Sequence, residues 1–569
     1  AGAASTPAAG AAGSSPLEPS PSAVGPEPAP SSANPGSTDV REASVLAMLA
    51  RDCGACHDSG QSAGGVGSIT DIQSLVSSGL VVPGNDERSP LLESIRSGRM
   101  PPAGAASRPS VGEEWLLQGF IDGLIEPGLI EGCRPPAFPS VDEVYALLLA
   151  DVLAQPEAQR PFLRYASLTD DDPRLCGVPL QQRRNALSEA VNGVSLDPEI
   201  HVPVPIDAGE LVYRIDIRDY DWDRPLDLDG DGNVDHGDGW QAILAASGTY
   251  AVELRGPEAD ALREATGSTV PVLAGGALIS AVSFGDVYYT LIGAEPNIFD
   301  TQLKLGIDVL ESLLNGVMRR AGFAREADGE QGELVVSRSP QALPGRAFWS
   351  LEEQPTGDSE SIYSDPFTFD RLSGQTIFNL PNGLQAYSAE TLEGARLAAS
   401  PRGCVGECVT PAADTIPAGC QGCHAGGVIP VRDQTRESVE RFSGQFDAET
   451  LELVRTVYPL PAELDALMAA DSAVHLAALE RAGVPANGPD PLARVYFSFE
   501  LEPLGAERAA AELGVTLAAL RESLPLLPPG FAALGGAGGV IPRAVMTDGQ
   551  GLARCVLHAS SRNRPANCP

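Results

Sequence analysis

CGACH at residues 53–57 and CQGCH at residues 420–424 are two copies of one motif, C-x-x-C-H. The motif is typical of covalent c-type haem attachment, because two thiols at this spacing can form thioethers with haem vinyl groups. The histidine that follows can then ligate the iron from one face. We therefore expect two haem c groups, with iron ligands at His57 and His424. The four attachment residues are Cys53, Cys56, Cys420 and Cys423.

Length, net charge and hydropathy bear on the number of domains and on the kinds of partner. The 569 residues predict three or four domains of ordinary size. The chain has 76 acidic and 38 basic residues and a net charge of −38. This charge argues against nucleic acid as a partner, because phosphate binding requires basic patches. No stretch of about 20 apolar residues appears, so no membrane-spanning helix is expected.

A second axial ligand for the first haem has to come from elsewhere in the fold. Five methionines are present, and Met100 lies between two predicted helices, stiffened by Pro101 and Pro102. We predict that Met100 is this ligand, since methionine is a common axial ligand in c-type cytochromes. Met48 lies on the helix before Cys53 and is expected to pack in a core.

A family resemblance rests on these residues. Residues of about 50–105 resemble the planctomycete-type cytochrome c domain. The matching segments are CGACH, the GG turn at 64–65, GLVVPG at 79–84, SPLL at 89–92 and RMPP at 99–102. The resemblance implies a mainly α cytochrome c domain, which we place at 41–132, and it selects Met100 as the distal iron ligand.

The ligation of the second iron stays open. Its candidate ligands are Met468, His475 and Met546. Met468 and His475 lie seven residues apart in one predicted helix and share a face. The alternative, which we favour, is that Met468 packs in a core and His475 lies at the surface.

The larger region resembles long exported cytochromes of planctomycete and myxobacterial type. The similarity is patchy over roughly 160–525. Its main segments are YRIDIRDYDW at 213–222, IFNLPNGLQAY at 377–387 and GVIP at 427–430 after the second motif. The resemblance implies a dihaem exported cytochrome and supplies no substrate.

An acidic stretch at 227–238 has the spacing of an EF-hand-type loop. Oxygen ligands at its positions 1, 3, 5, 9 and 12, and a glycine at position 6, suit a calcium ion. Five carboxylates this close also repel strongly without a cation. We predict calcium at this loop, and the alternative is a solvated acidic turn. The expected ligands are Asp227, Asp229, Asp231, Asn233, Asp235 and Asp238.

The other six cysteines and the first residues of the chain indicate where in or outside the cell the protein is found. Haem c is attached outside the cytoplasm, where disulfides also persist. We expect the pairs Cys404–Cys408, Cys555–Cys568 and Cys133–Cys176, with buried thiols as the alternative. The sequence begins at Ala1 without Met, which predicts a removed export signal. Residues 1–40 predict a disordered Ala/Pro/Ser tether, and the protein is expected in the periplasm or at the cell surface.

The fold expected beyond residue 132 is α+β. Region 133–400 would carry the calcium-like loop, and region 401–569 would be mainly helical, hold the second haem and pack on 133–400. Apolar spacing predicts helices, and strict alternation predicts strands at 213–218 and 495–501. Weaker strands are expected at 335–336 and 375–380. The predicted helices are 141–153, 181–194, 301–320, 448–457, 462–482 and 506–524.

Three hypotheses about function follow. The first is an electron-transfer cytochrome whose redox partner docks through a basic face. The second is a dihaem peroxidase or oxygenase-like enzyme with an open coordination position on the second iron. The third is a calcium-stabilised cell-surface haem module. We favour electron transfer, because no nucleophile or substrate-binding signature is recognisable.

Overall fold

The computed structural model is a mixed α+β structure. It describes residues 40–57, 69–82, 86, 89–102, 105, 107–123, 135–171, 173, 175–226, 237–283, 285–327, 330–354, 361–367, 373–397, 416–485, 490–501, 503–536, 538–566 and 568. The predicted tether, and most of the calcium-like loop, lie outside these residues.

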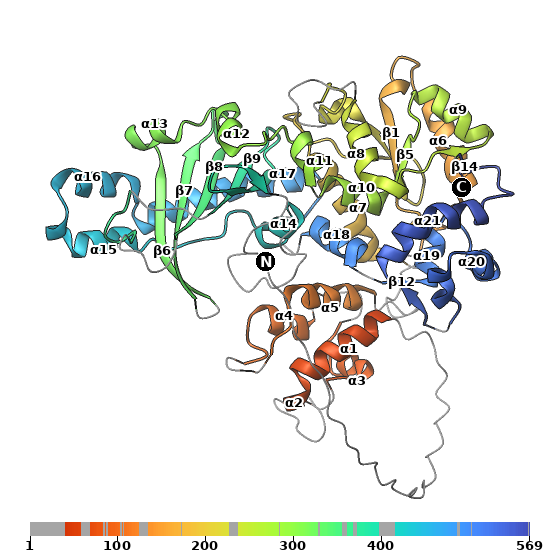
Figure 1. The fold of residues 1–569 in the computed structure, drawn as a ribbon, viewed down its shortest axis with the longest axis horizontal. Helices are drawn as coiled ribbons and strands as arrows, with labels where there is room; N and C mark the ends of the chain where they lie inside the picture. The colour runs from red at the N-terminus through yellow and green to blue at the C-terminus, as the bar shows by residue number, and fades with distance from the viewer. Residues whose placement is uncertain are drawn as a thin grey trace, which may run out of the picture.

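A small helical unit comes first in the described chain and lies beside the rest of the molecule (Figure 1). It has its own apolar cluster, which includes Met48, Leu49 and Leu92. The Asp71 carboxylate caps the third helix by accepting a hydrogen bond from the Ser74 amide. The helices are α1 (Val40–Asp52), α2 (Gly54–His57), α3 (Ile72–Ser77), α4 (Pro90–Arg96) and α5 (Val111–Gly123).

A four-stranded sheet with strand order β2-β3-β1-β5 forms one end of the larger body. Strand β1 (Leu163–Ser167) pairs antiparallel with β3 (Val212–Asp216) and parallel with β5 (Val272–Ala274). The edge strand is β2 (Val204–Pro205). The helices of this end are α6 (Val141–Ala154), α7 (Gly177–Asn192), α8 (Gly239–Ser247), α9 (Pro257–Thr266), α10 (Gly275–Val282) and α11 (Gly285–Leu291).

A six-stranded antiparallel sheet forms the opposite end (Figure 1). Its order is β11-β10-β9-β8-β7-β6, so each strand lies beside its neighbour in the chain. The strands are β6 (Arg319–Ala327), β7 (Glu330–Pro340), β8 (Ala347–Gln354), β9 (Ser373–Asn379), β10 (Gln385–Thr391) and β11 (Arg396–Leu397). The accompanying helices are α12 (Ile298–Lys304), α13 (Val309–Leu314), α15 (Thr435–Arg441), α16 (Ala448–Val457) and α17 (Pro461–Arg481).

The main core joins segments from both sides of residue 400. It runs from Val144 to Phe497 and includes Ala418, which lies on α14 (Ala418–His424). The last part of the chain has a separate cluster around Phe531 and Met546. Its elements are α18 (Pro491–Leu501), β12 (Leu504–Gly505), α19 (Ala506–Glu512), α20 (Leu517–Ser523), β13 (Val540–Ile541) and α21 (Arg543–Leu557). Strand β14 (Arg564–Pro565) pairs with β4 (Leu254–Arg255).

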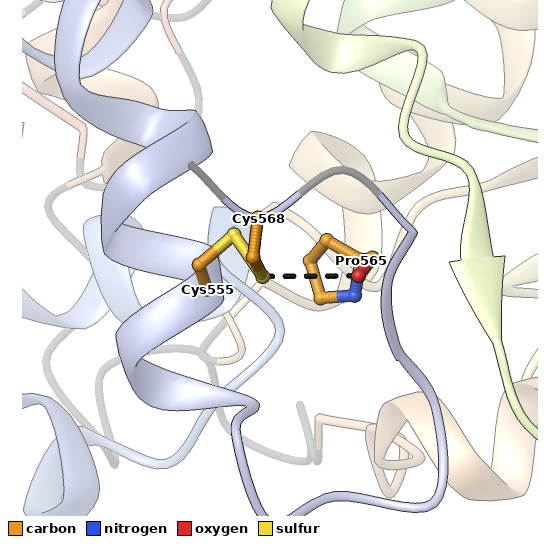
Figure 2. Close-up of a disulfide and its surroundings, with 3 residues drawn as sticks. All are labelled: Cys555, Pro565 and Cys568. Carbon is orange, nitrogen blue, oxygen red and sulfur yellow. Dashed lines mark hydrogen bonds between the residues drawn. A yellow bond between two sulfur atoms is a disulfide. The ribbon is translucent and has the colours of Figure 1, made fainter.

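One predicted disulfide is confirmed at the end of the chain. Cys555 on α21 is bonded to Cys568, whose sulfur lies 3.7 Å from the Pro565 carbonyl oxygen (Figure 2). Cys176 is also disulfide-bonded. Its predicted partner Cys133 lies outside the described residues, as do Cys404 and Cys408.

Several predicted helices and strands are confirmed. The helices predicted at 141–153, 181–194, 448–457 and 462–482 correspond to α6, α7, α16 and α17. The strand predicted at 213–218 corresponds to β3, and the two weaker ones lie in β7 and β9.

Three predicted elements are wrong. Residues 495–501, predicted as a strand, belong to helix α18. The helix predicted at 301–320 is α12, α13 and the start of β6, interrupted where Gly306 and Gly316 adopt positive φ. The helix predicted at 506–524 is interrupted by Gly514, also at positive φ, and separates into α19 and α20.

No helix in the described part of the chain combines the length and the apolar character that crossing a membrane requires.

A buried ion pair ties the helical unit to the larger body. Arg494 on α18 lies 2.8 Å from the Asp86 carboxylate, and both side chains are 3% exposed. The same carboxylate accepts a hydrogen bond of 2.6 Å from Gln118 on α5. Because a buried charge is stable only with partners, this contact holds α5 against α18.

We predict that Asp86→Ala lowers the free energy of unfolding by about 3–5 kcal/mol, because it removes the carboxylate that faces a buried guanidinium. Denaturant unfolding of the full chain measures the change. The matched control is Glu93→Ala, which breaks an exposed pair with Arg99 and should change the free energy by about 1 kcal/mol or less. Equal effects of the two substitutions would contradict the prediction.

Candidate functional site

The first C-x-x-C-H motif lies at the end of helix α1 and forms the short helix α2. The Cys53 amide donates to the Leu49 carbonyl at 2.9 Å, and the His57 amide donates to the Cys53 carbonyl at 3.0 Å. Cys53 is buried and Cys56 is exposed, and both are reduced cysteines. Burial raises the pKa of the Cys53 thiol to about 11. The two thiols are therefore one helical turn apart, and they differ in exposure.

His57 fits an axial iron ligand in part. Its Nδ1 atom is buried and has no hydrogen-bond partner among the described residues. A ligating histidine is normally oriented by a hydrogen bond at this atom, and the described residues around His57 do not provide one.

Met100 occupies the loop that follows α4. Its amide donates to the Ser94 carbonyl at 2.9 Å, which fixes the start of the loop. The side chain is 42% exposed, whereas Met48 is buried, as expected, in the helical cluster. Residues 58–68, which connect His57 to the rest of the unit, lie outside the described residues, so Met100 as a ligand stays a prediction.

The second motif forms helix α14, which is packed into the main core. Ala418 and Gln421 are buried on it, and its two motif cysteines are reduced and partly exposed. Helix α14 contacts α18. The Gln421 side chain also lies next to Gly193, which ends helix α7. The motif is thus held from two sides by segments distant in the sequence.

His424 has the hydrogen bond that a ligating histidine needs. Its Nδ1 lies 3.0 Å from the Gly427 carbonyl oxygen. A carbonyl only accepts, so Nδ1 carries the proton, and burial lowers the pKa of the ring so that it is neutral. The Nε2 atom then keeps its lone pair for a metal, which is the usual arrangement of metal-bound histidine.

Gly427 allows this geometry. Its φ is +93°, and a Cβ at this position would lie 2.6 Å from the Ser472 side chain. The Ser472 hydroxyl accepts a hydrogen bond from the Val428 amide at 3.0 Å. Helix α17 therefore braces the turn that orients His424.

Helix α17 is itself anchored to the six-stranded sheet. Asp471 forms a bidentate ion pair with Arg338 on β7, at 2.7 and 2.8 Å. It also accepts a hydrogen bond of 2.9 Å from the indole of Trp349 on β8. Bidentate pairs of this kind fix orientation as well as position.

The three candidate sixth ligands for the second iron are all occupied by other contacts. Met468 packs in a buried cluster with Trp349 and Leu464, which confirms the expected core role. Met546 lies in the C-terminal cluster. The expectation that His475 is a surface residue is wrong, because this side chain is 4% exposed.

His475 is oriented as a hydrogen-bond donor. Its Nδ1 accepts from the Gln385 amide at 3.2 Å. Burial, and then the neighbouring His424, lower its pKa to about 4, so the ring is neutral and its proton is on Nε2. A protonated Nε2 cannot ligate iron, but it can donate a hydrogen bond.

Buried tyrosines that the sequence did not single out as functional also contact the second motif. The Tyr387 ring centroid lies 5.8 Å from that of His424. The Tyr288 hydroxyl accepts from the Tyr387 amide at 2.8 Å. Burial raises the pKa of both tyrosines, so both are neutral.

A buried pair of acids lies close to these tyrosines. Glu189 on α7 and Asp490, directly before α18, are hydrogen-bonded to each other. The pKa of each is raised, chiefly by burial, and the two carboxyl groups share a proton. Sequence spacing gives no signal for this pair, because the two residues are about 300 positions apart.

The calcium-like loop is described only at its ends. Asp227, Asp229, Asp231, Asn233 and Asp235 lie outside the described residues. Leu226 and Gly237 pair as an antiparallel bridge that closes the loop.

Asp238, the last predicted calcium ligand, has other partners. It caps α8 by accepting from the Gln241 amide at 2.9 Å, and its second oxygen lies 3.6 Å from Arg164. Among the described residues, no group of three or more His, Cys, Asp or Glu side chains is arranged to hold a metal ion.

No family model, no curated protein and no solved structure matches the chain.

We predict that a calcium chelator lowers the melting temperature of the full chain, because a cation bound only to the folded loop stabilises the fold. Asp231→Asn should remove most of this effect, and the matched control Asp223→Asn, an exposed acid just before the loop, should retain it. Differential scanning calorimetry with and without chelator measures the shift. A melting temperature insensitive to calcium would rule out the site.

Proposed function

We propose that this protein is an exported dihaem c-type cytochrome that acts in electron transfer. One haem would be attached at Cys53 and Cys56 in a cytochrome c domain of the helical unit, and the other at Cys420 and Cys423. The observation that carries the proposal is the hydrogen bond from His424 Nδ1 to Gly427, which leaves Nε2 ready to ligate iron.

The surroundings of His424 support a redox role. A bound haem supplies one-electron chemistry, and the protein has to fix its ligand and limit access of water. Gly427 and Ser472 orient the imidazole, while Tyr288 and Tyr387 add a buried, neutral wall. Buried contacts that orient the imidazole would keep the ligand geometry similar in both oxidation states.

The charge of the chain supports a protein partner with a basic docking face. The net charge is −38 before any haem propionates are counted. An acidic protein attracts basic partners at long range and accelerates their association at low ionic strength. Association with a redox partner would therefore slow as salt is added.

We predict that the exported protein carries two covalently bound haems, visible as haem c bands in reduced-minus-oxidised spectra and as added mass. Replacing Cys53 and Cys56 by Ala should remove one haem, and replacing Cys420 and Cys423 by Ala should remove the other. The matched control replaces Cys555 and Cys568 by Ala, which breaks the disulfide and should leave both haems in place.

A protein exported by a host that matures c-type cytochromes, yet recovered without haem mass, would refute the proposal. A product with one haem would restrict the proposal to the motif that still carries a haem.

A second candidate function, a dihaem peroxidase or oxygenase-like enzyme, is supported by His475. The ring is a donor at Nε2 beside His424. Of the described candidates on α17, Met468 packs in a core cluster with Trp349, and His475 has its Nδ1 occupied by the Gln385 amide. This arrangement favours an open position on the second iron, with a hydrogen-bond donor nearby.

Electron paramagnetic resonance of the oxidised protein separates the two functions. A high-spin ferric signal that shifts when cyanide is added supports the enzyme, because an open position binds the added ligand. Two low-spin signals support electron transfer alone. His475→Gln should alter the high-spin signal if His475 faces the open position, and the matched control His201→Gln, at a partly exposed residue that pairs with Asp197, should not.

A further inference from the structure

A cavity lies between the four-stranded sheet and the C-terminal elements. Its volume is about 120 Å³, and its walls come from α6, β5, α19 and α21 together with the loop after β1. Apolar side chains such as Val144 and Leu273 form much of the lining. A few polar groups converge on it, which is typical of a small-molecule site. They are Tyr145, Ser167, Thr169, Asp170, Tyr250, Glu512, Arg554 and His558.

Asp170 faces this cavity with an unsatisfied carboxyl group. Its Oδ1 atom is buried and has no hydrogen-bond partner among the described residues. Burial, and then the nearby Asp171 and Glu512, raise the pKa of Asp170 to about 7. Up to neutral pH the group is therefore largely a neutral acid that can donate a hydrogen bond.

Arg554 brings a positive charge to the same cavity. Its guanidinium donates to the Glu512 backbone carbonyl at 2.6 Å. No carboxylate in the described part of the chain forms an ion pair with it, and burial lowers its pKa. A partly buried cation without a counter-charge is unfavourable unless an anion joins it.

The neighbouring carboxyl groups supply this negative charge only in part. The Glu512 carboxylate is held by Arg543 at 2.5 Å and Arg508 at 3.2 Å. Asp171, beside Asp170, pairs with Arg183 at 2.9 Å. Glu512 and Asp170 attract Arg554 electrostatically, but the Glu512 carboxylate is shared with two other arginines, so the guanidinium groups outnumber the carboxyl groups here.

The remaining titratable groups are neutral. The Nε2 atom of His558 donates to the Leu513 carbonyl at 2.7 Å, and burial lowers the pKa of this ring. Burial raises the pKa of Tyr145 and Tyr250. Asp170 is then the group whose charge changes near neutral pH.

We propose that this cavity binds the anion of a small aliphatic monocarboxylic acid, with its carboxylate between Arg554 and Asp170 and its short chain against Val144 and Leu273. The guanidinium neutralises the bound charge, and the Asp170 hydroxyl donates to it. This binding site is independent of the proposed haem groups.

The volume limits the size of the ligand. An engineered apolar cavity of about 150 Å³ holds benzene, which has six heavy atoms. Butyrate also has six heavy atoms and is therefore a suitable probe for a cavity of about 120 Å³. Affinity for so small a ligand should be in the millimolar range.

The first test compares three probes on the full-length holoprotein by ligand-observed NMR. We expect butyrate to bind, and its neutral isostere butyramide to bind about tenfold more weakly or worse, because it lacks the charge that Arg554 requires. Butylamine should not bind. Sodium chloride at matched ionic strength controls for screening.

The second test uses pH and variants. The dissociation constant for butyrate should rise about tenfold per pH unit above about pH 7, as Asp170 ionises and repels the ligand. Asp170→Asn keeps a donor and should flatten this dependence. Arg554→Gln should weaken binding about tenfold or more, and the matched control Arg521→Gln, an exposed residue on α20, should leave it unchanged.

The outcomes decide the proposal. Tighter binding of butylamine than of butyrate would overturn it, since the cavity would then select cations. Failure of butyrate to bind at about 50 mM, well above the expected millimolar affinity, would also overturn it. Because the probe series needs no substitution, it remains decisive even if Arg554→Gln fails to fold.

Discussion

Helix α18 is buried along almost its whole length, and the arrangement of both C-x-x-C-H motifs depends on it. Residues 491–499 are all buried. The helix contacts α7 and α10 of the main core, α14 with the second motif and α5 of the helical unit. A Cβ at Gly276 would lie 2.5 Å from the Phe499 ring, so α10 approaches at a distance that only glycine permits. At its other side Arg494 reaches Asp86. One apolar helix with a single buried charge thus sets where the two motif-bearing units sit.

The same helix shows where sequence patterns mislead. The alternation of apolar residues with high strand propensity predicts a strand at 495–501. Because this segment is packed on every side, alternation does not mark one buried face, and tertiary packing overrides the propensity. Proline is common at the first position of a helix, so Pro491 indicates a helix start here. The alternating apolar pattern gives the opposite prediction. Helices with one exposed face, such as α16 and α17, were predicted nearly to the residue, because water on one side makes periodicity informative. Gly306 and Gly514 ended long predicted helices through backbone conformation, which composition alone does not reveal.

Some features of the candidate site follow from the local sequence, and others depend on residues that are far apart in the chain. The motif residues and the proposed role of His424 follow from five consecutive positions, and the hydrogen bond of His424 to Gly427 lies within the same short segment. The partners supplied from far away could not be predicted: His475 was expected at the surface, and the shared proton of Glu189 and Asp490 had no sequence signal. These contacts depend on how α7, α17 and α18 meet, which is a property of packing and not of spacing.

The packing of α14 also has a consequence for the order in which the protein is assembled. Ala418 and Gln421 are buried, and α18 covers the helix that carries them. If the second motif carries the proposed haem, attachment to Cys420 and Cys423 would come before α18 packs over α14, because the closed core limits access to this helix. The first motif lies at the end of α1, where Cys56 is exposed and Cys53 is buried. The proposed loading of the second motif would therefore precede closure of the core.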